Sequence, residues 1–169
     1  MMVLTGSRAA TLRGCLPTWR QGRMVDHDFY AGADEREAFL TKLAAEGAHL
    51  ERQDTARSVT AIVNRSEMIS IMAPDAVCAA ILRCDDNRPM THLGWPVLVI
   101  SERTQLALKQ GYIDRCAIHR RKNLADIAFW AARVSLEPQH LNVCAAMAEA
   151  ATDIWPQSQP KGIPCPTPS

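Results

Sequence analysis

The densest group of chemically capable residues in this sequence lies between Arg115 and Asn123, in the run RCAIHRRKN. Four of its nine members carry a positive charge, and the others include a thiol and an imidazole. Guanidinium and ammonium groups bind phosphates and the edges of bases in nucleic acids. The run therefore predicts a nucleic-acid-binding site whose members are Arg115, His119, Arg120, Arg121 and Lys122.

A helix-turn-helix over residues 102–122 would present these side chains. Ala107 precedes Gly111 by four positions, a spacing that lets two helices cross closely so that the second enters a major groove. The match to the motif is incomplete, because Ala117 and Arg120 stand where the motif needs apolar core residues. The alternative is a helix followed by a solvated basic loop.

A metal or thiol centre is a second interpretation of the same run. Cys116 and His119 are spaced C-x-x-H, and Cys78, Cys84 and His92 would have to complete a tetrahedral set. The five residues between Cys78 and Cys84 exceed the usual two to four. Neighbouring arginines would lower the pKa of a Cys116 thiol, which makes a nucleophile conceivable. We expect neither a metal nor a cofactor, and we keep a Cys116/His119 enzyme as an alternative.

The predicted function is a small soluble regulatory or accessory protein of the cytoplasm that contacts DNA through the helix-turn-helix-like segment 102–122. A protein-binding adaptor or inhibitor that acts through the C-terminal helices is the other alternative. Residues 137–155 are rich in alanine and apolar on more than one side, which also suits a homodimer. The sequence favours a protein that is not an enzyme, because it contains no Walker-type phosphate loop and no G-x-G-x-x-G run.

Composition limits the classes of partner. The formal net charge is +1, so an electrostatic partner must be bound by a local patch and not by the whole surface. No apolar run approaches the roughly 20 residues that span a bilayer. The six cysteines are scattered, which is typical of reduced thiols and not of a disulfide framework.

The elements that would position these residues indicate an α+β fold. Residues 59–63 and 68–72 predict a β-hairpin with a polar four-residue loop, and the apolar run 97–100 predicts one further strand. Four to five helices surround this small sheet, and their apolar residues recur with helical spacing. They begin near Asp34, Pro74, Ser101, Asn123 and Pro138. An all-α fold is the alternative if residues 59–72 are helical.

Three segments describe the expected domain organisation. Residues 1–23 contain four arginines and no acidic residue, and we expect a disordered basic extension. Residues 24–155 form a single globular domain. Residues 156–169 contain five prolines and predict a disordered tail.

Overall fold

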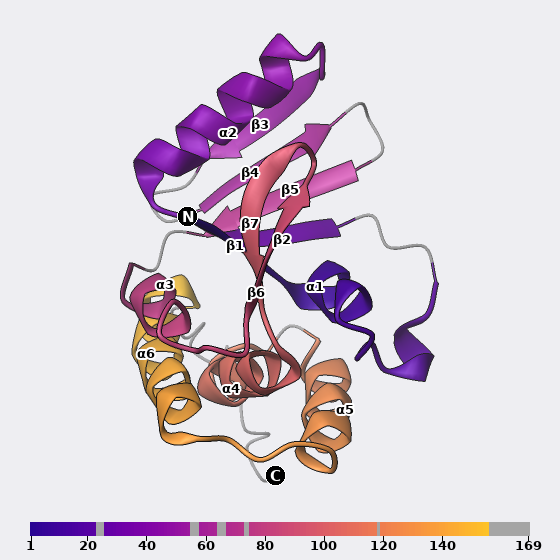
Figure 1. The fold of residues 1–169 in the computed structure, drawn as a ribbon, viewed down its shortest axis with the longest axis vertical. Coiled ribbons are helices and arrows are strands. Elements are labelled where there is room, and N and C mark those ends of the chain that lie inside the picture. The colour runs from indigo at the N-terminus through magenta and orange to yellow at the C-terminus, as the bar shows by residue number, and fades with distance from the viewer. Residues whose placement is uncertain (23–25, 55–57, 64–66, 73–74, 118, 156–169) are drawn as a thin grey trace, which may run out of the picture.

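The structure is a computed structural model that describes residues 1–22, 26–54, 58–63, 67–72, 75–117 and 119–155 (Figure 1). The strands are β1 Met2–Thr5, β2 Asp26–Tyr30, β3 Leu50–Asp54, β4 Ser58–Val63, β5 Glu67–Met72, β6 Arg88–His92 and β7 Trp95–Val99. The α-helices are α1 Gly6–Leu12, α2 Ala33–Ala45, α3 Asp75–Ile81, α4 Glu102–Tyr112, α5 Arg120–Ala131 and α6 Pro138–Ile154, and a 3₁₀ turn, η1, covers Thr18–Arg20.

A mixed seven-stranded sheet in the order β3-β4-β5-β2-β1-β7-β6 organises the fold. β1 lies inside the sheet, antiparallel to β2 and parallel to β7. Its four residues are buried without alternation, as expected for a strand covered on both faces. β2 in turn pairs in parallel with β5. This central position of β1 and β2 matters for the site described below.

The two faces of β2 meet different neighbours. Phe29 contacts Phe39 of α2 at 5.5 Å between ring centroids, and Phe39 also contacts Trp95 of β7. The next residue, Tyr30, donates a hydrogen bond to the sulfur of Met147 in α6 at 3.8 Å. Because successive side chains of a strand point to opposite faces, α2 covers one face of β2 and α6 covers the other. In Figure 1, α2 accordingly lies at the end of the molecule away from α4, α5 and α6.

The α+β class predicted from the sequence is confirmed, and the all-α alternative is wrong. The predicted hairpin is present as β4 and β5, with Val59 opposite Ile71, and the run 97–100 ends β7. The sheet is much larger than the hairpin plus one strand that we expected. The four additional strands are β1, β2, β3 and β6. β3 and β6 are edge strands with mostly polar, exposed residues, so they carry little apolar signal.

The structure differs from the expected organisation at the N-terminus. The expected disordered extension 1–23 contains β1, α1 and η1, and β1 is entirely buried. Its apolar residues pair with β7, a contact that no local pattern reveals. The predicted tail 156–169 lies outside the described residues. None of the helices that the structure describes has the length and apolar composition needed to cross a membrane.

Candidate active site

The turn between β1 and α1 lies directly against a carboxylate of β2. Gly6 has a backbone φ of 64°, a conformation that glycine adopts without strain. A Cβ atom on Gly6 would collide with the Oδ2 atom of Asp28. Glycine is therefore required here for two reasons, the backbone conformation and the close approach of the chain to Asp28. Gly6 and Ser7 are the first two residues of α1, and together they form the Gly6–Ser7 turn at its N-terminus.

Two carboxylates project from one face of β2. Asp26 and Asp28 are two positions apart in the strand, so both point away from the face that bears Phe29. Burial raises the pKa of Asp28, and the nearby charge of Asp26 raises it further. The pair thus places the poorly solvated carboxylate of Asp28 beside the exposed carboxylate of Asp26, and this concentration of negative charge favours binding of a cation.

Three basic side chains counter this charge. The positive charges of Lys109, Lys122 and Arg20 act to lower the pKa of Asp28. Lys109 belongs to α4, Lys122 to α5 and Arg20 to η1, so the site draws on several elements. Arg20 also donates a hydrogen bond to the Oγ atom of Ser7. These cations surround the Gly6–Ser7 turn.

Lys109 is held in place by α5. Its Nζ atom donates to Oδ1 of Asn123 at 2.9 Å and lies 3.2 Å from Oδ2 of Asp126. Burial lowers the pKa of Lys109, and Asp126 opposes that shift. The Nε atom of Arg20 lies 3.9 Å from the same Asp126 oxygen. Asp126 therefore anchors two cations beside the turn.

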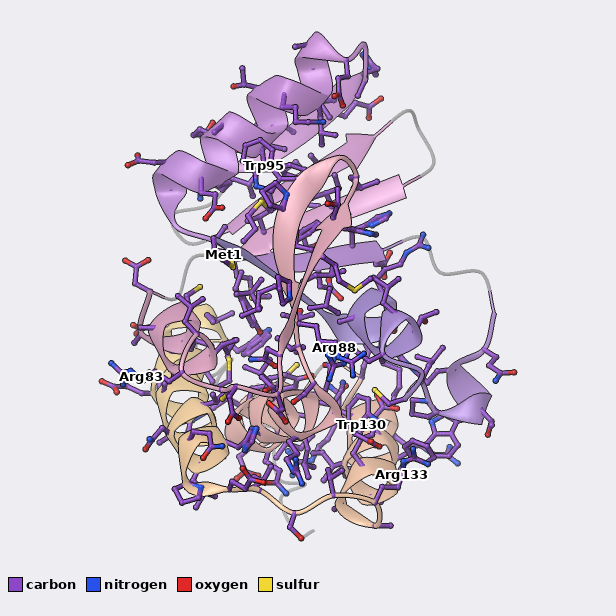
Figure 2. All side chains as sticks on the ribbon, in the orientation of Figure 1. Met1, Arg83, Arg88, Trp95, Trp130 and Arg133 are labelled. Atoms are coloured by element: carbon purple, nitrogen blue, oxygen red, sulfur yellow. The ribbon has the colours of Figure 1, made fainter. Side chains whose placement is uncertain are left out.

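The aromatic side chain of Trp130 closes this region from α5. Figure 2 shows Trp130 extending from α5 toward the segment that follows α1. Its Nε1 atom donates to the backbone oxygen of Cys15 at 2.9 Å, and the side chain is 2% exposed. A small pocket remains between the Gly6–Ser7 turn, Lys109, Asp126 and Trp130.

Asp26 and Asp28 suit a hard divalent cation whose remaining ligands come from water and from the phosphates of a substrate. Among the described residues, no group of three or more His, Cys, Asp or Glu side chains could hold a metal ion. Ser70 of β5 is the residue paired with Asp28, so a hydroxyl and not a third carboxylate stands beside it. Mg²⁺ is commonly bound through only one or two carboxylates, with waters and substrate phosphates as its other ligands. Asp26 and Asp28 meet that requirement.

No protein-family model matches the sequence, and no curated protein matches it either. Solved structures do resemble it in fold. The crystal structure of ANT(2")-Ia in complex with adenylyl-2"-tobramycin matches with a TM-score of 0.56 and 13% identity, over 89% of this chain and 88% of the other. The solution structure of the antibiotic-resistance factor ANT(2'')-Ia matches with a TM-score of 0.51 and 11% identity, over 90% and 83%.

The chain is similar in fold to ANT(2")-Ia, a nucleotidyltransferase. The predicted function of a DNA-contacting regulator is therefore wrong. The segment 102–122 is also not a helix-turn-helix. Gly111 lies within α4, where a Cβ atom would meet the Cys144 backbone oxygen at 2.6 Å, so this glycine permits close packing on α6 and forms no turn. The second helix starts only at Arg120.

The five predicted nucleic-acid-binding residues are all exposed, Arg120 to Lys122 in the first turn of α5 and the other two before it, and their binding to nucleic acid stays a prediction. Arg120 is occupied by its own chain: it donates to the Ile113 backbone oxygen at 2.7 Å and lies 3.5 Å from an Asp114 oxygen. Arg115, His119 and Arg121 are exposed. Of the five, Lys122 alone contributes to the electrostatic environment of Asp28 described above.

The fold similarity also contradicts the two alternatives to the predicted function. Cys116 is buried and His119 is exposed, and neither belongs to a metal-binding group within the described part of the chain. Burial raises the pKa of Cys78 to about 11 and raises that of Cys84, so both favour the neutral thiol. α6, on which the adaptor surface was predicted, packs on α3 and α4 along one side, and its other side, with Leu141, is exposed. Its buried residues are His140, Val143, Met147 and Ala151.

Sequence reasoning missed the residues that form this site. The available signal was the run DHDFY, in which acidic residues alternate with buried ones, as in a half-buried strand with two carboxylates on one face. A Gly-Ser pair precedes it, after a short apolar run that forms β1. No sequence pattern indicates that Lys109 and Asp126 belong to the site, because they lie on α4 and α5, far from β2 in the sequence.

Proposed function

We propose that this protein is an enzyme that transfers a nucleoside monophosphate from a nucleoside triphosphate to a hydroxyl group of a small acceptor. The observation that carries the proposal is the Asp26–Asp28 pair, against which the Gly6–Ser7 turn is packed and around which basic residues gather. The similarity in fold to ANT(2")-Ia, solved with adenylyl-2"-tobramycin, supports this chemistry.

The reaction exchanges one ester bond for another. The acceptor oxygen forms a bond to the α-phosphorus, the bond from that phosphorus to the oxygen bridging to the β-phosphate breaks, and pyrophosphate leaves with the electron pair. The acceptor's hydroxyl proton passes to a carboxylate of the site or to water. When bound, Mg²⁺ would neutralise phosphate charge and polarise the α-phosphoryl group, with Asp26 and Asp28 as its protein ligands.

The chain's own residues bind and orient the anionic substrate. Arg20 presents a guanidinium group beside the Gly6–Ser7 turn, and such groups form strong charge-assisted hydrogen bonds with phosphate oxygens. Lys109 adds positive charge at the same place, while its Nζ atom contacts Tyr112, Asn123 and Asp126. Because both cations are anchored by Asp126, they are arranged before the substrate arrives. Preorganised charges of this kind stabilise the negative charge that develops on the leaving pyrophosphate.

Two measurements test this function. Isothermal titration calorimetry with ATP, GTP, CTP and UTP in Mg²⁺ should show binding of at least one nucleotide, and Asp28→Asn should weaken it at least tenfold. Pyrophosphate release with tobramycin as the first acceptor should depend on the acceptor and on Asp28. Absence of Mg²⁺-dependent binding for all four nucleotides would refute the function. Binding without release would refute tobramycin as the acceptor and nothing more.

Two predictions about the protein as a whole accompany this function. The described cysteines form no disulfides, which suits the reducing cytoplasm that the sequence predicted. The homodimer predicted through residues 137–155 stays a prediction, and sedimentation velocity of the full chain tests it.

A further inference from the structure

Asp126 carries a feature that phosphate binding does not use. Its side chain is 1% exposed and lines the pocket beside the Gly6–Ser7 turn. Its Oδ2 atom faces Lys109 and Arg20, as described above. Its Oδ1 atom is buried and has no hydrogen-bond partner among the described residues. A buried carboxylate oxygen without a donor is unfavourable, so this oxygen is poised to accept a hydrogen bond from a ligand.

The pocket in front of Asp126 selects the kind of group that can enter. It has room for a group about the size of a water molecule, which admits a hydroxyl and excludes a nucleobase. Arg20 and Lys109 also line the pocket, but a phosphate group is too large for this space and the Oδ1 atom of Asp126 repels it. A hydroxyl donates a hydrogen bond and carries no charge, so it satisfies both conditions and replaces any water held there.

The position of the pocket relative to Asp28 indicates that this hydroxyl belongs to the ribose of the nucleotide. The pocket is lined by Gly6 and Ser7, the same turn that lies against Asp28. If the α-phosphate binds at Asp28, the ribose follows after one ester oxygen, whereas the base lies farther away. We propose that the unpartnered Oδ1 atom of Asp126 accepts a hydrogen bond from the 2'- or the 3'-hydroxyl of the nucleotide's ribose, so that the enzyme discriminates against the nucleotide that lacks this hydroxyl. This inference rests on the proposed function.

Calorimetric titration with three nucleotides tests the inference without an acceptor. ATP, 2'-deoxy-ATP and 3'-deoxy-ATP are compared in Mg²⁺, and the ratio of dissociation constants is the readout. A hydrogen bond to a buried charged group predicts that one deoxy analogue binds about 10- to 100-fold more weakly than ATP. The analogue affected identifies the 2'- or the 3'-hydroxyl. In Asp126→Ala, all three nucleotides should bind with equal affinity.

The matched control is Asn123→Ala. Asn123 also anchors Lys109 but does not line the pocket, so its removal weakens phosphate binding and leaves the ratio unchanged. If Asp126→Ala does not fold, Asp126→Asn is measured instead, and its ratio should fall at least threefold because a neutral amide accepts a weaker hydrogen bond.

Two results would overturn the inference. One is equal binding of all three nucleotides to the unmodified protein. The other is a ratio that persists in the Asp126 variants. Absence of nucleotide binding altogether would overturn the proposed function as well, so the two failures are distinguishable.

Discussion

Replacing Gly6 by alanine separates the role of this residue in the site from its role in the fold. Gly6 and Gly47 both have positive φ, 64° and 86°, but a Cβ atom at Gly47 would meet nothing within 4 Å. Alanine in this left-handed conformation lowers stability by about 1–2 kcal/mol. Replacing glycine also lowers the conformational entropy of the unfolded chain, which raises stability by about 0.4–1 kcal/mol. Gly47→Ala should therefore lower stability by about 1 kcal/mol, which is about 2–4 °C in Tm.

Gly6→Ala incurs the same strain and also displaces Asp28 or the turn. Because a misplacement of about 1 Å in a catalytic group costs about 100-fold in rate, nucleotidyl transfer should fall by about that factor in Gly6→Ala. Gly47→Ala should retain nearly full activity. Thermal melting and pyrophosphate release, measured on both variants, give the two quantities. Equal activities in the two variants would refute the reasoning that close contact between Gly6 and Asp28 builds the site.

Three further predictions concern stability and charge. Burial raises the pKa of Asp28 in the folded protein above its usual 3.8, so the folded state binds this proton more tightly than the unfolded state does. The contribution of Asp28 to stability therefore falls as pH rises from about 4 through the raised pKa. Asp28→Asn should therefore melt higher than the unmodified protein at pH 8, and the gain should vanish below about pH 4 in a pH series of melting curves; a lower Tm at pH 8 contradicts this. Gly111→Ala should lower stability by about 1–3 kcal/mol in urea unfolding, because α4 and α6 have no room for a methyl group; an unchanged midpoint contradicts the close packing. Arg121→Ala should leave Mg²⁺–nucleotide binding within about twofold in calorimetry, since this exposed arginine does not line the pocket and is not among the cations that lower the pKa of Asp28. A loss of tenfold or more would place this arginine in the site.

Local periodicity predicts helices α2 to α6 and the hairpin, but it predicts neither α1 nor the full sheet. Phe39, Leu40 and Leu43 form a stripe that marks α2, and all three are buried. β1 has only four residues, and its place inside the sheet depends on pairing with Val97–Val99 almost a hundred positions later. Such long-range pairing leaves no local signal, so the N-terminal segment was taken for an extension.

The basic run misled the functional interpretation for a related physical reason. Charge density in the sequence says where cations are, but not whether the chain itself already neutralises them. Arg120 is satisfied by Asp114 and a backbone oxygen. Lys109 is an isolated lysine in a helix of mixed composition, yet it is the cation that the fold buries beside the carboxylates. Tertiary packing, and not local charge density, decides which charges lie beside the carboxylates of β2.

Two side chains of the candidate site, Asp28 and Asp126, are in energetically unfavourable environments when no ligand is bound. The carboxylate of Asp28 is desolvated next to Asp26, and Oδ1 of Asp126 has no donor among the described residues. A cation relieves the first and a ribose hydroxyl relieves the second, so Mg²⁺ and nucleotide should stabilise the fold through separate residues. The Tm increase produced by Mg²⁺ alone should therefore be lost in Asp28→Asn and kept in Asp126→Ala. If Asp126→Ala also abolished the Mg²⁺ effect, the two residues would act as one unit, and the division of the site into a metal part and a sugar part would be wrong.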